Sequence, residues 1–417
     1  MKIFVIGGGG REHALCWKLA QDGHTIAAAP GNPGIAQVAE VFPIPVNDRM
    51  GLLQAAQSFQ PDFIIVGPED PLIAGIADMF RANDFKVFGP DQSAARLEGS
   101  KSFSKDMMKR SGVPTAAFQS FSDPRQAKDF AAAKFANGSQ VVVKASGAAL
   151  GKGVIVCDEF PDAEKAIDDM LIELAFGEAG RTIVVEERLF GQEFSLFTLI
   201  SGQSICSLPV AQDYKRVGDG DSGPNTGGMG SYCPASWVTP DLIQSCEETV
   251  VRPILSTLAE LDITYQGVLF SGMILTESGP KCLEYNVRFG DPEIQSVVRT
   301  IGKGFAEALF AVASGDPIPD ITTNGQSSVS VVMAAKNYPG SPETGAEIAI
   351  GELPSGVEIF AAGAKSSGST WQVSGGRVLA VSAVGKSLAE ARSLAYQGVD
   401  AVQFEGQQYR TDIAAQP

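Results

Sequence analysis

Short apolar runs alternate with amphipathic stretches over the first hundred residues. The runs at 3–7, 25–30, 63–66 and 86–88 have the length of β-strands, and the stretches between them repeat apolar residues every three or four positions, as helices with one buried face do. Gly, Pro, Asn and Asp fill the loops that follow the strands. This alternation predicts a doubly wound parallel sheet, with ligands bound beyond the carboxyl ends of its strands.

The pattern changes near residue 100. Two apolar strands, at 140–144 and 153–157, flank the small-residue loop KASGAALGKG, and further strands and a helix near 240–260 follow, before a strand-rich tail. The chain is therefore expected to be a multidomain α/β and α+β protein. The predicted divisions are an N-terminal αβ domain (1–103), a lid part (104–190), a catalytic part (191–320) and a small C-terminal strand-rich domain (321–417).

Composition narrows the classes of function. The 417 residues carry a net charge of −16, which disfavours a nucleic-acid partner and requires any anionic ligand to meet a local basic island. There is no apolar stretch of membrane-spanning length and no signal peptide is expected. Six cysteines without a C-x-x-C pair, and two histidines, argue against zinc and disulfides and favour a reducing cytoplasm.

The loop IGGGGREHA follows the first strand. It fails the G-x-G-x-x-G dinucleotide fingerprint, because Glu12 or His13 stands at the third glycine, so an NAD-binding oxidoreductase is disfavoured. The free N–H groups of the next helix could still bind a phosphate, with Arg11 adding charge. The alternative is a tight turn without a ligand.

The loop KASGAALGKG is not a P-loop, because it joins two strands and lacks the G-x-x-x-x-G-K-[ST] order. Its glycines would nevertheless let backbone N–H groups approach phosphate oxygens that lysines neutralise. A hairpin loop with solvated lysines is the alternative.

In the strand PKCLEYNVRF, a period of two puts Glu284, Asn286 and Arg288 on one face. The oxygen ligands of the first two suit a hard cation such as Mg²⁺; an exposed Glu–Arg face is the alternative. Likewise, the acids at the end of TIVVEERL could accept hydrogen bonds from adenine or ribose, or could be solvated.

Taken in order, these segments resemble the ATP-grasp superfamily, which has a two-part nucleotide-binding region. The blocks GGGGREHAL, APGNPG, VGPEDPL, LEGSKSFSK, QDYKRVGDGDSGPNTGGMGSY, EYNVRFGDPE and GGRVLAV are similar to the phosphoribosylamine–glycine ligase family, over residues 1 to about 413. GPNTGGMG and RFGDPE are the most specific.

The resemblance implies the second step of purine synthesis, in which ATP activates glycine as glycyl phosphate and phosphoribosylamine opens it. It implies ATP and Mg²⁺ or Mn²⁺, small-molecule substrates, no nucleic acid or membrane partner, and a monomer or weak homodimer. The main rival is another ATP-grasp carboxylate–amine ligase; a regulatory protein that kept the fold but lost catalysis is a further alternative.

The resemblance also implies roles for individual residues. ATP would be bound by Lys105, Lys144, Ser146, Gly147, Gly151, Lys152, Gly153, Glu186, Glu187, Leu189 and Glu193. The metal would be held by Glu284 and Asn286. The acyl phosphate and amine would be surrounded by Arg288, Asp213 and Lys215. The substrates would be covered or contacted by Gly9, Gly10, Arg11, Asn225, Thr226, Gly227, Gly228, Met229, Gly230 and Asp291.

Two features depart from the family pattern. Ser146 stands where the family usually has an acidic residue in the lid loop, and the chain stops soon after YRTDI. The strand GVLFSGMIL also offers no carboxylate as a further metal ligand.

Overall fold

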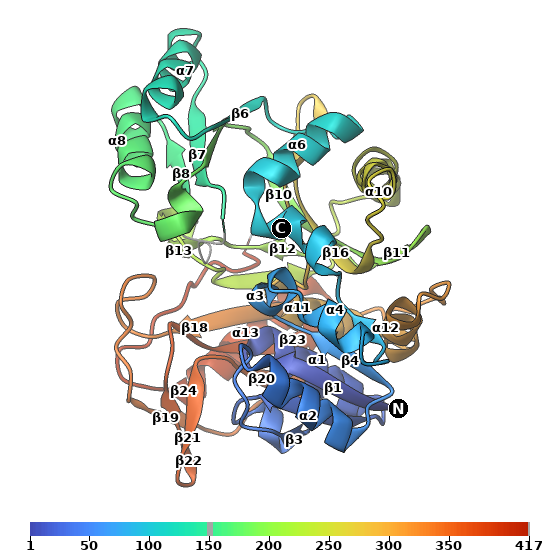
Figure 1. Cartoon of the computed structure of the whole chain (residues 1–417). Helices are drawn as coiled ribbons and strands as arrows, with labels where there is room; N and C mark the ends of the chain where they lie inside the picture. The colour runs from blue at the N-terminus through green and yellow to red at the C-terminus, as the bar shows by residue number, and fades with distance from the viewer. Residues whose placement is uncertain (148–152, 416–417) are drawn as a thin grey trace.

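The N-terminal region is a parallel five-stranded sheet between helices. The computed structural model describes residues 1–147 and 153–415, and Figure 1 shows this sheet at the bottom, in blue. The strand order is β3-β2-β1-β4-β5. The strands are β1 (Lys2–Gly7), β2 (Thr25–Pro30), β3 (Glu40–Val41), β4 (Phe63–Val66) and β5 (Val87–Phe88). The helices are α1 (Gly10–Gln21), α2 (Arg49–Phe59), α3 (Glu69–Ile73), α4 (Ile76–Arg81) and α5 (Gln92–Gly99). The doubly wound sheet predicted from the sequence is confirmed.

The lid part is a small antiparallel sheet with two helices packed on it, at the top left of Figure 1. Its strand order is β6-β9-β7-β8. The strands are β6 (Phe118–Phe121), β7 (Val141–Ala145), β8 (Val154–Cys157) and β9 (Ile183–Glu187), and the helices are α7 (Pro124–Ala136) and α8 (Phe160–Leu171). Helix α6 (Lys101–Ser111) precedes them. The predicted pair of strands around the small-residue loop is therefore present as β7 and β8.

The catalytic part is built on a second antiparallel sheet, of order β11-β10-β16-β17. Its strands are β10 (Gln192–Ser201), β11 (Ser204–Ser207), β16 (Gln266–Thr276) and β17 (Gly279–Asn286). The helices are α9 (Pro240–Cys246), continued by a π-helical turn (Glu247–Val251) and α10 (Arg252–Ala259), then α11 (Glu293–Thr300) and α12 (Phe305–Ser314). Phe88 of the N-terminal sheet stacks on Phe289 at 5.7 Å between ring centroids, which fixes the segment after β17 against β5.

A third sheet joins the catalytic part to the C-terminal region. Its order is β12-β15-β18-β23-β20. The strands are β12 (Gln212–Asp213), β15 (Gly230–Cys233), β18 (Ser327–Ala334), β20 (Val357–Ala361) and β23 (Arg377–Gly385). The first two flank the glycine-rich segment and pair with each other, and β15 pairs with the C-terminal β18. The predicted long loop at 213–232 also contains a short hairpin, β13 (Arg216–Gly218) and β14 (Ser222–Asn225).

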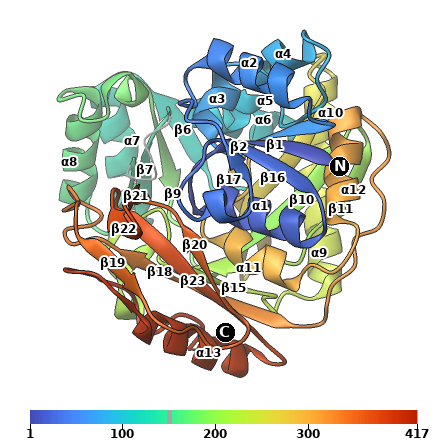
Figure 2. The same cartoon turned by 90° about the horizontal axis from the view of Figure 1, so that it is seen from below.

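The remaining C-terminal elements form a small sheet and one helix. The sheet contains β19 (Glu347–Ile350), β21 (Ala364–Ser367), β22 (Thr370–Val373) and β24 (Val402–Gln403), and the helix is α13 (Leu388–Asp400). Strand β20 of the third sheet lies next to the N-terminal α1 (Figure 2), where His13 packs edge-on against Phe360. The N-terminal and C-terminal regions therefore meet around the glycine-rich segment.

Candidate active site

Two buried lysines share one carboxylate between the lid sheet and helix α6. Antiparallel pairing places Lys144 of β7 and Glu186 of β9 on the same face, because Val142 lies opposite Glu186. Lys105 Nζ lies 2.6 Å from Glu186 Oε2, and Lys144 pairs with the other carboxylate oxygen. All three side chains are buried. Burial lowers the pKa of Lys105, whereas for Lys144 the charges of Glu186 and Glu284 outweigh burial and raise the pKa.

Ser146 ties the lid loop to the start of helix α6. Its backbone carbonyl accepts a hydrogen bond from the N–H of Lys101 at 2.6 Å, and its Oγ accepts one from the N–H of Ser102 at 3.0 Å. These are N–H groups that a helix leaves unsatisfied at its first turn. Ser146 thus caps the N-terminus of α6, as the acidic residue of the family pattern could also do. The same contacts position the helix that carries Lys105.

Lys101 is a further basic residue of this region, to which the sequence motifs assign no role. Its Nζ lies 3.4 Å from the carbonyl oxygen of Gly147, and burial lowers its pKa, with Glu284 opposing that effect. Of the other residues predicted to bind ATP, the structure places Glu187 at the end of β9 and Glu193 in β10, with Leu189 between these strands. Gly153 is buried just before β8. Gly151 and Lys152 lie outside the described residues.

The predicted metal ligands lie on β17, at its end nearest the lysines. Glu284 and Asn286 alternate with the buried Tyr285, as the period of two predicts. The charges of Lys144, Lys101 and Lys215 outweigh burial and lower the pKa of Glu284, so its carboxylate is ionised. Within the described ranges no three His, Cys, Asp or Glu side chains converge as a complete ligand set. An ionised carboxylate and an amide oxygen beside phosphate-binding lysines fit a Mg²⁺ or Mn²⁺ ion that completes its shell with phosphate and water.

Arg288 lies two residues beyond the end of β17, yet the alternation continues, since Val287 and Phe289 are buried on either side of it. The ladder stops at Asn286, and the guanidinium instead reaches the N-terminal part of the chain. Arg288 lies 2.8 Å from Glu98 Oε1 and 3.3 Å from Glu69 Oε2. Burial would lower its pKa, but these two acids raise it. Neither acid was singled out from the sequence, because their proximity to Arg288 depends on the packing of α3 against α5 and of α5 against β17.

A cluster of mixed charge surrounds Lys215. Its Nζ lies 2.5 Å from Glu193 Oε2 and 3.4 Å from Asp213 Oδ1. Burial raises the pKa of Asp213 although Lys215 opposes it, and the acids raise the pKa of Lys215 well above its usual range despite burial. The structure therefore brings the predicted Asp213, Lys215 and Glu193 together. It also places Thr226 there, because its hydroxyl donates to the Lys215 carbonyl at 2.8 Å.

The glycine-rich segments from distant parts of the chain meet at Asp291. A Cβ added to Gly10 would lie 3.7 Å from Asp291 Oδ2, and one added to Gly9 would lie 3.9 Å from it. Gly228 has φ +110 and packs on Pro292, where a Cβ would approach to 2.4 Å. The close approach and the positive φ together require glycine at 228.

Arg11 and the remaining loop residues are held by neighbouring groups. Arg11 donates to the Phe289 carbonyl at 2.9 Å and to Glu12 at 2.7 Å, and Gly9 N–H donates to Glu12 at 2.6 Å. Asn225 ends β14, while Met229 and Gly230 are buried at the start of β15. The structure thus gathers the predicted substrate residues at one junction, and their contacts with substrate stay predictions.

Arg377 of β23 is a further residue of this junction that the sequence did not reveal. It donates to the carbonyl oxygens of Gly227 and Asp291, each at 2.6 Å. Tyr338 OH accepts a hydrogen bond from the Gly227 N–H at 3.0 Å. The C-terminal region therefore holds both backbone groups of Gly227: Tyr338 accepts from its N–H, and Arg377 donates to its carbonyl oxygen.

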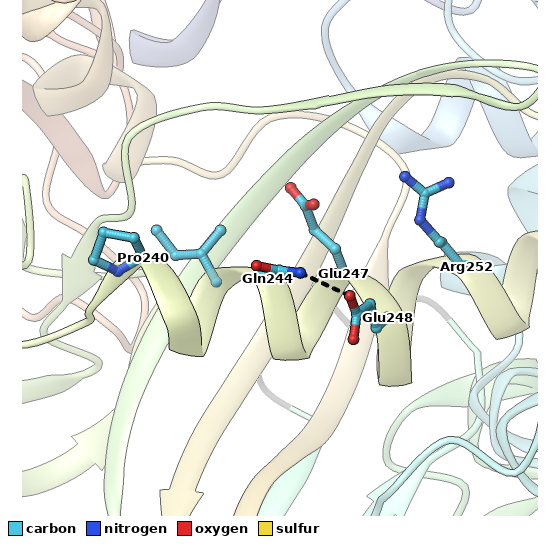
Figure 3. A pocket seen from close by; sticks show the side chains of 6 residues that line it. Pro240, Gln244, Glu247, Glu248 and Arg252 are labelled. Carbon is cyan, nitrogen blue, oxygen red and sulfur yellow. Dashed lines mark hydrogen bonds between the residues drawn. The ribbon is translucent and has the colours of Figure 1, made fainter.

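Two surface hollows lie away from these residues. One of about 410 Å³ follows α9 and α10 (Figure 3), and another of about 460 Å³ lies between α7 and α8. Neither is lined by a residue predicted to bind ATP, metal or substrate.

Among the helices in the described part of the chain, none combines the length and apolar character needed to cross a bilayer.

Most of the chain is matched by models of one family. Residues 1–98, 99–294 and 328–416 match the N domain, the ATP-grasp (A) domain and the C domain of phosphoribosylglycinamide synthetase. The chain belongs to the phosphoribosylglycinamide synthetase family. The resemblance seen in the motifs is thereby confirmed, and with it an ATP-dependent ligase of the glycine-ligation step of purine synthesis.

Individual relatives agree over the full length. The phosphoribosylamine–glycine ligase of Rhizobium meliloti is 42% identical over 423 residues, which cover 99% of this chain and 98% of that protein. A crystal structure of the ligase of that name from Thermotoga maritima has a TM-score of 0.87 at 35% identity, covering 99% of this chain and 100% of that one.

More distant structures share the fold alone. The biotin carboxylase domain of a Hydrogenobacter thermophilus 2-oxoglutarate carboxylase, described in complex with MgADP, ADP and bicarbonate, has a TM-score of 0.74 at 16% identity. It covers 98% of this chain and 91% of that one.

Proposed function

We propose that this chain joins glycine to 5-phosphoribosylamine, with ATP converted to ADP and phosphate, through a glycyl phosphate. The observation that carries the proposal is the adjacency of the Lys105–Glu186–Lys144 group to Glu284, whose pKa the charge of Lys144 helps to lower. Phosphate-binding ammonium groups beside an ionised metal-binding carboxylate are what phosphoryl transfer from ATP requires.

The nucleotide would lie between the lid sheet and β17. Lys105 and Lys144 would exchange part of their pairing with Glu186 for phosphate oxygens, while Glu186 and Glu187 would meet the adenine edge and Glu193 the ribose. The N–H groups of Ser146 and Gly147 donate to the carbonyl groups of Thr182 and Ala179, at 2.9 and 3.2 Å, and so hold the loop in place, while Gly153 would bring its backbone N–H group over the phosphates. Glu284 and Asn286 would hold the Mg²⁺ or Mn²⁺ ion, which when bound supplies charge neutralisation on the phosphates.

The acyl half of the reaction would take place beside Lys215. A carboxylate resists attack by an amine until phosphorylation gives it a better leaving group. Lys215 and Arg288 would hold the glycine carboxylate in line with the terminal phosphate, and their charge would stabilise the acyl phosphate. Asn225 to Gly230 would cover the intermediate and exclude water, which would otherwise hydrolyse it.

The phosphoribosyl group of the amine would lie at the junction of Gly9, Gly10, Arg11 and Asp291. There it would meet the N-terminus of α1, where Arg11 adds a positive charge. We place the enzyme in the cytoplasm, in keeping with its unpaired cysteines. We also expect it to be a monomer or a weak homodimer.

The deciding experiment is the release of ADP on mixing enzyme with MgATP, glycine and freshly prepared phosphoribosylamine. We expect ADP formation to require both co-substrates and to yield glycinamide ribonucleotide in equal amount. ADP formation that needs another acid or amine instead, such as bicarbonate with biotin, would support the rival ATP-grasp ligase.

A further inference from the structure

Glu293 is a buried carboxyl group without a cationic partner. It begins α11, five residues after Arg288, and is only 4% exposed. Ser195 Oγ donates a hydrogen bond to its Oε1 at 3.1 Å. In the parts of the chain that the structure describes, no lysine or arginine nitrogen pairs with it within 4.0 Å. Burying a carboxyl group is costly unless a positive charge or several donors compensate for it.

The absence of a side chain at Gly290 leaves space for the Glu293 carboxyl group, near the residues around Lys215 where we propose that the acyl phosphate forms. A Cβ on Gly290 would lie 2.6 Å from Glu293 Oε2 and 2.9 Å from Oε1, so a side chain at 290 would displace the carboxyl group. Burial and the negative charge of Asp213 raise the pKa of Glu293 to about 7. Asp213 and Glu293 are therefore neighbouring acids that repel each other, although Lys215 and Arg288 moderate the repulsion.

We propose that Glu293, together with Asp213, binds the ammonium group of the amino-acid substrate. This inference rests on the proposed function and names a determinant of specificity for the same site. Glycine is a zwitterion, so a site for it needs cations and anions a few ångströms apart. Lys215 and Arg288 supply the cations, and Asp213 and Glu293 supply the anions.

A bound ammonium group would explain why Asp213 and Glu293 lie close together in a buried site. An ammonium group between them converts their mutual repulsion into two charge-assisted hydrogen bonds. Ser195 fixes the direction of one Glu293 oxygen, so the other is left for the substrate. An acid that carries a hydroxyl group in place of the ammonium, such as glycolate, would leave the repulsion between Asp213 and Glu293 in place and would be rejected.

The first test compares glycine with glycolate on Glu293→Gln. We expect the KM for glycine to rise about 10- to 100-fold, while the KM for ATP changes by less than about twofold. The inhibition constant of glycolate should change little, so that discrimination between the two ligands collapses. If the variant weakens both ligands equally, or leaves the KM for glycine unchanged, the inference is overturned.

The matched control is Glu247→Gln. Glu247 also accepts a hydrogen bond from a serine hydroxyl, that of Ser207 at 2.6 Å, but it lines the hollow of Figure 3 away from the site. Its kinetic constants should match those of the unmodified enzyme. Equal effects in both variants would show that Glu293 acts only through folding.

A second measurement needs no variant. A proton on Glu293 competes with the ammonium group, so the KM for glycine should rise as the pH falls from 8 to 6, with a midpoint near 7. The charged groups acting on Glu293 are Asp213, Lys215 and Arg288, and glycine itself stays zwitterionic over this range. Glycolate inhibition should lack that rise; the same rise for both ligands would overturn the inference. An enzyme that shows no glycine-dependent turnover at any pH would instead refute the proposed function.

Discussion

Glu186 holds two buried ammonium groups, one on each oxygen of its carboxylate. Lys105 comes from helix α6 and Lys144 from strand β7, so a single acid links the helix to the lid sheet. Burial disfavours the charged form of both lysines, and the charge of Glu186 opposes that effect. The carboxylate thus favours the ammonium form of both lysines, which the phosphates that we propose they bind require.

Glu186→Gln should weaken both the fold and ATP binding. Removing one partner of a buried ion pair leaves uncompensated charge and typically costs about 3–5 kcal/mol. We expect a lower free energy of unfolding by chemical denaturation and a KM for ATP raised at least about tenfold. Glu343→Gln breaks an exposed pair, Lys336 to Glu343 at 3.0 Å, and should change stability by under about 1 kcal/mol. Equal losses in the two variants would contradict the role of Glu186.

Glu284→Gln should abolish turnover in a folded protein. The amide keeps the shape but removes the charge on which the predicted metal site depends, so kcat should fall at least about 100-fold and excess Mg²⁺ should not restore it. Steady-state kinetics over a range of Mg²⁺, with circular dichroism as the check on folding, measures this. Glu277→Gln changes an exposed acid in the turn of the same β16–β17 hairpin and should retain full activity. Near-normal activity of Glu284→Gln at saturating Mg²⁺ would remove Glu284 from the metal site.

Ser146→Ala should destabilise the start of helix α6. The variant loses the side-chain acceptor for the Ser102 N–H, a loss that costs about 0.5–2 kcal/mol at helix N-termini. Ser146→Asp should retain that acceptor and place a negative charge at the helix N-terminus, where it is favourable. Thermal unfolding of the two variants beside Ser355→Ala, an exposed serine, tests this. If alanine and aspartate behave alike, Ser146 does not cap the helix.

Local patterns revealed the elements of this fold but not how distant segments pair. The strand β17 and the alternation of Glu284 with Tyr285 follow from a period of two. By contrast, β12 and β15 join the C-terminal sheet, a long-range pairing that periodicity cannot reveal.

The same limit applies to the site. Lys105, Lys144 and Glu284 were found through motifs, since each lies in a segment with a recognisable sequence. Glu69, Glu98 and Arg377 also lie in recognisable segments, but their sequence assigns them no role, because only the packing of the chain brings them to Arg288 or Gly227.

Arg377→Ala should impair the acyl steps more than nucleotide binding. The guanidinium holds the carbonyl groups of Gly227 and Asp291 together, so its loss frees the glycine-rich segment that we propose covers the intermediate. Hydrogen bonds to charged groups contribute about 1.5–3 kcal/mol, which corresponds to a fall of about 10- to 150-fold in kcat/KM for glycine and phosphoribosylamine. The Kd for ATP, measured by calorimetry, should change little, because Arg377 lies on β23, outside the elements that carry the lysines.

Arg377→Lys distinguishes charge from geometry. Both carbonyl groups accept from one guanidinium nitrogen, Nη1, and a lysine on its differently shaped side chain would have to bring its single nitrogen to the same point, so we expect only partial recovery. Arg252→Ala, at an exposed arginine on the hollow of Figure 3, controls for the loss of a positive charge and should behave as the unmodified enzyme. A loss of ATP affinity in Arg377→Ala as large as the loss in kcat/KM would show that the C-terminal region supports the whole site rather than the glycine-rich segment.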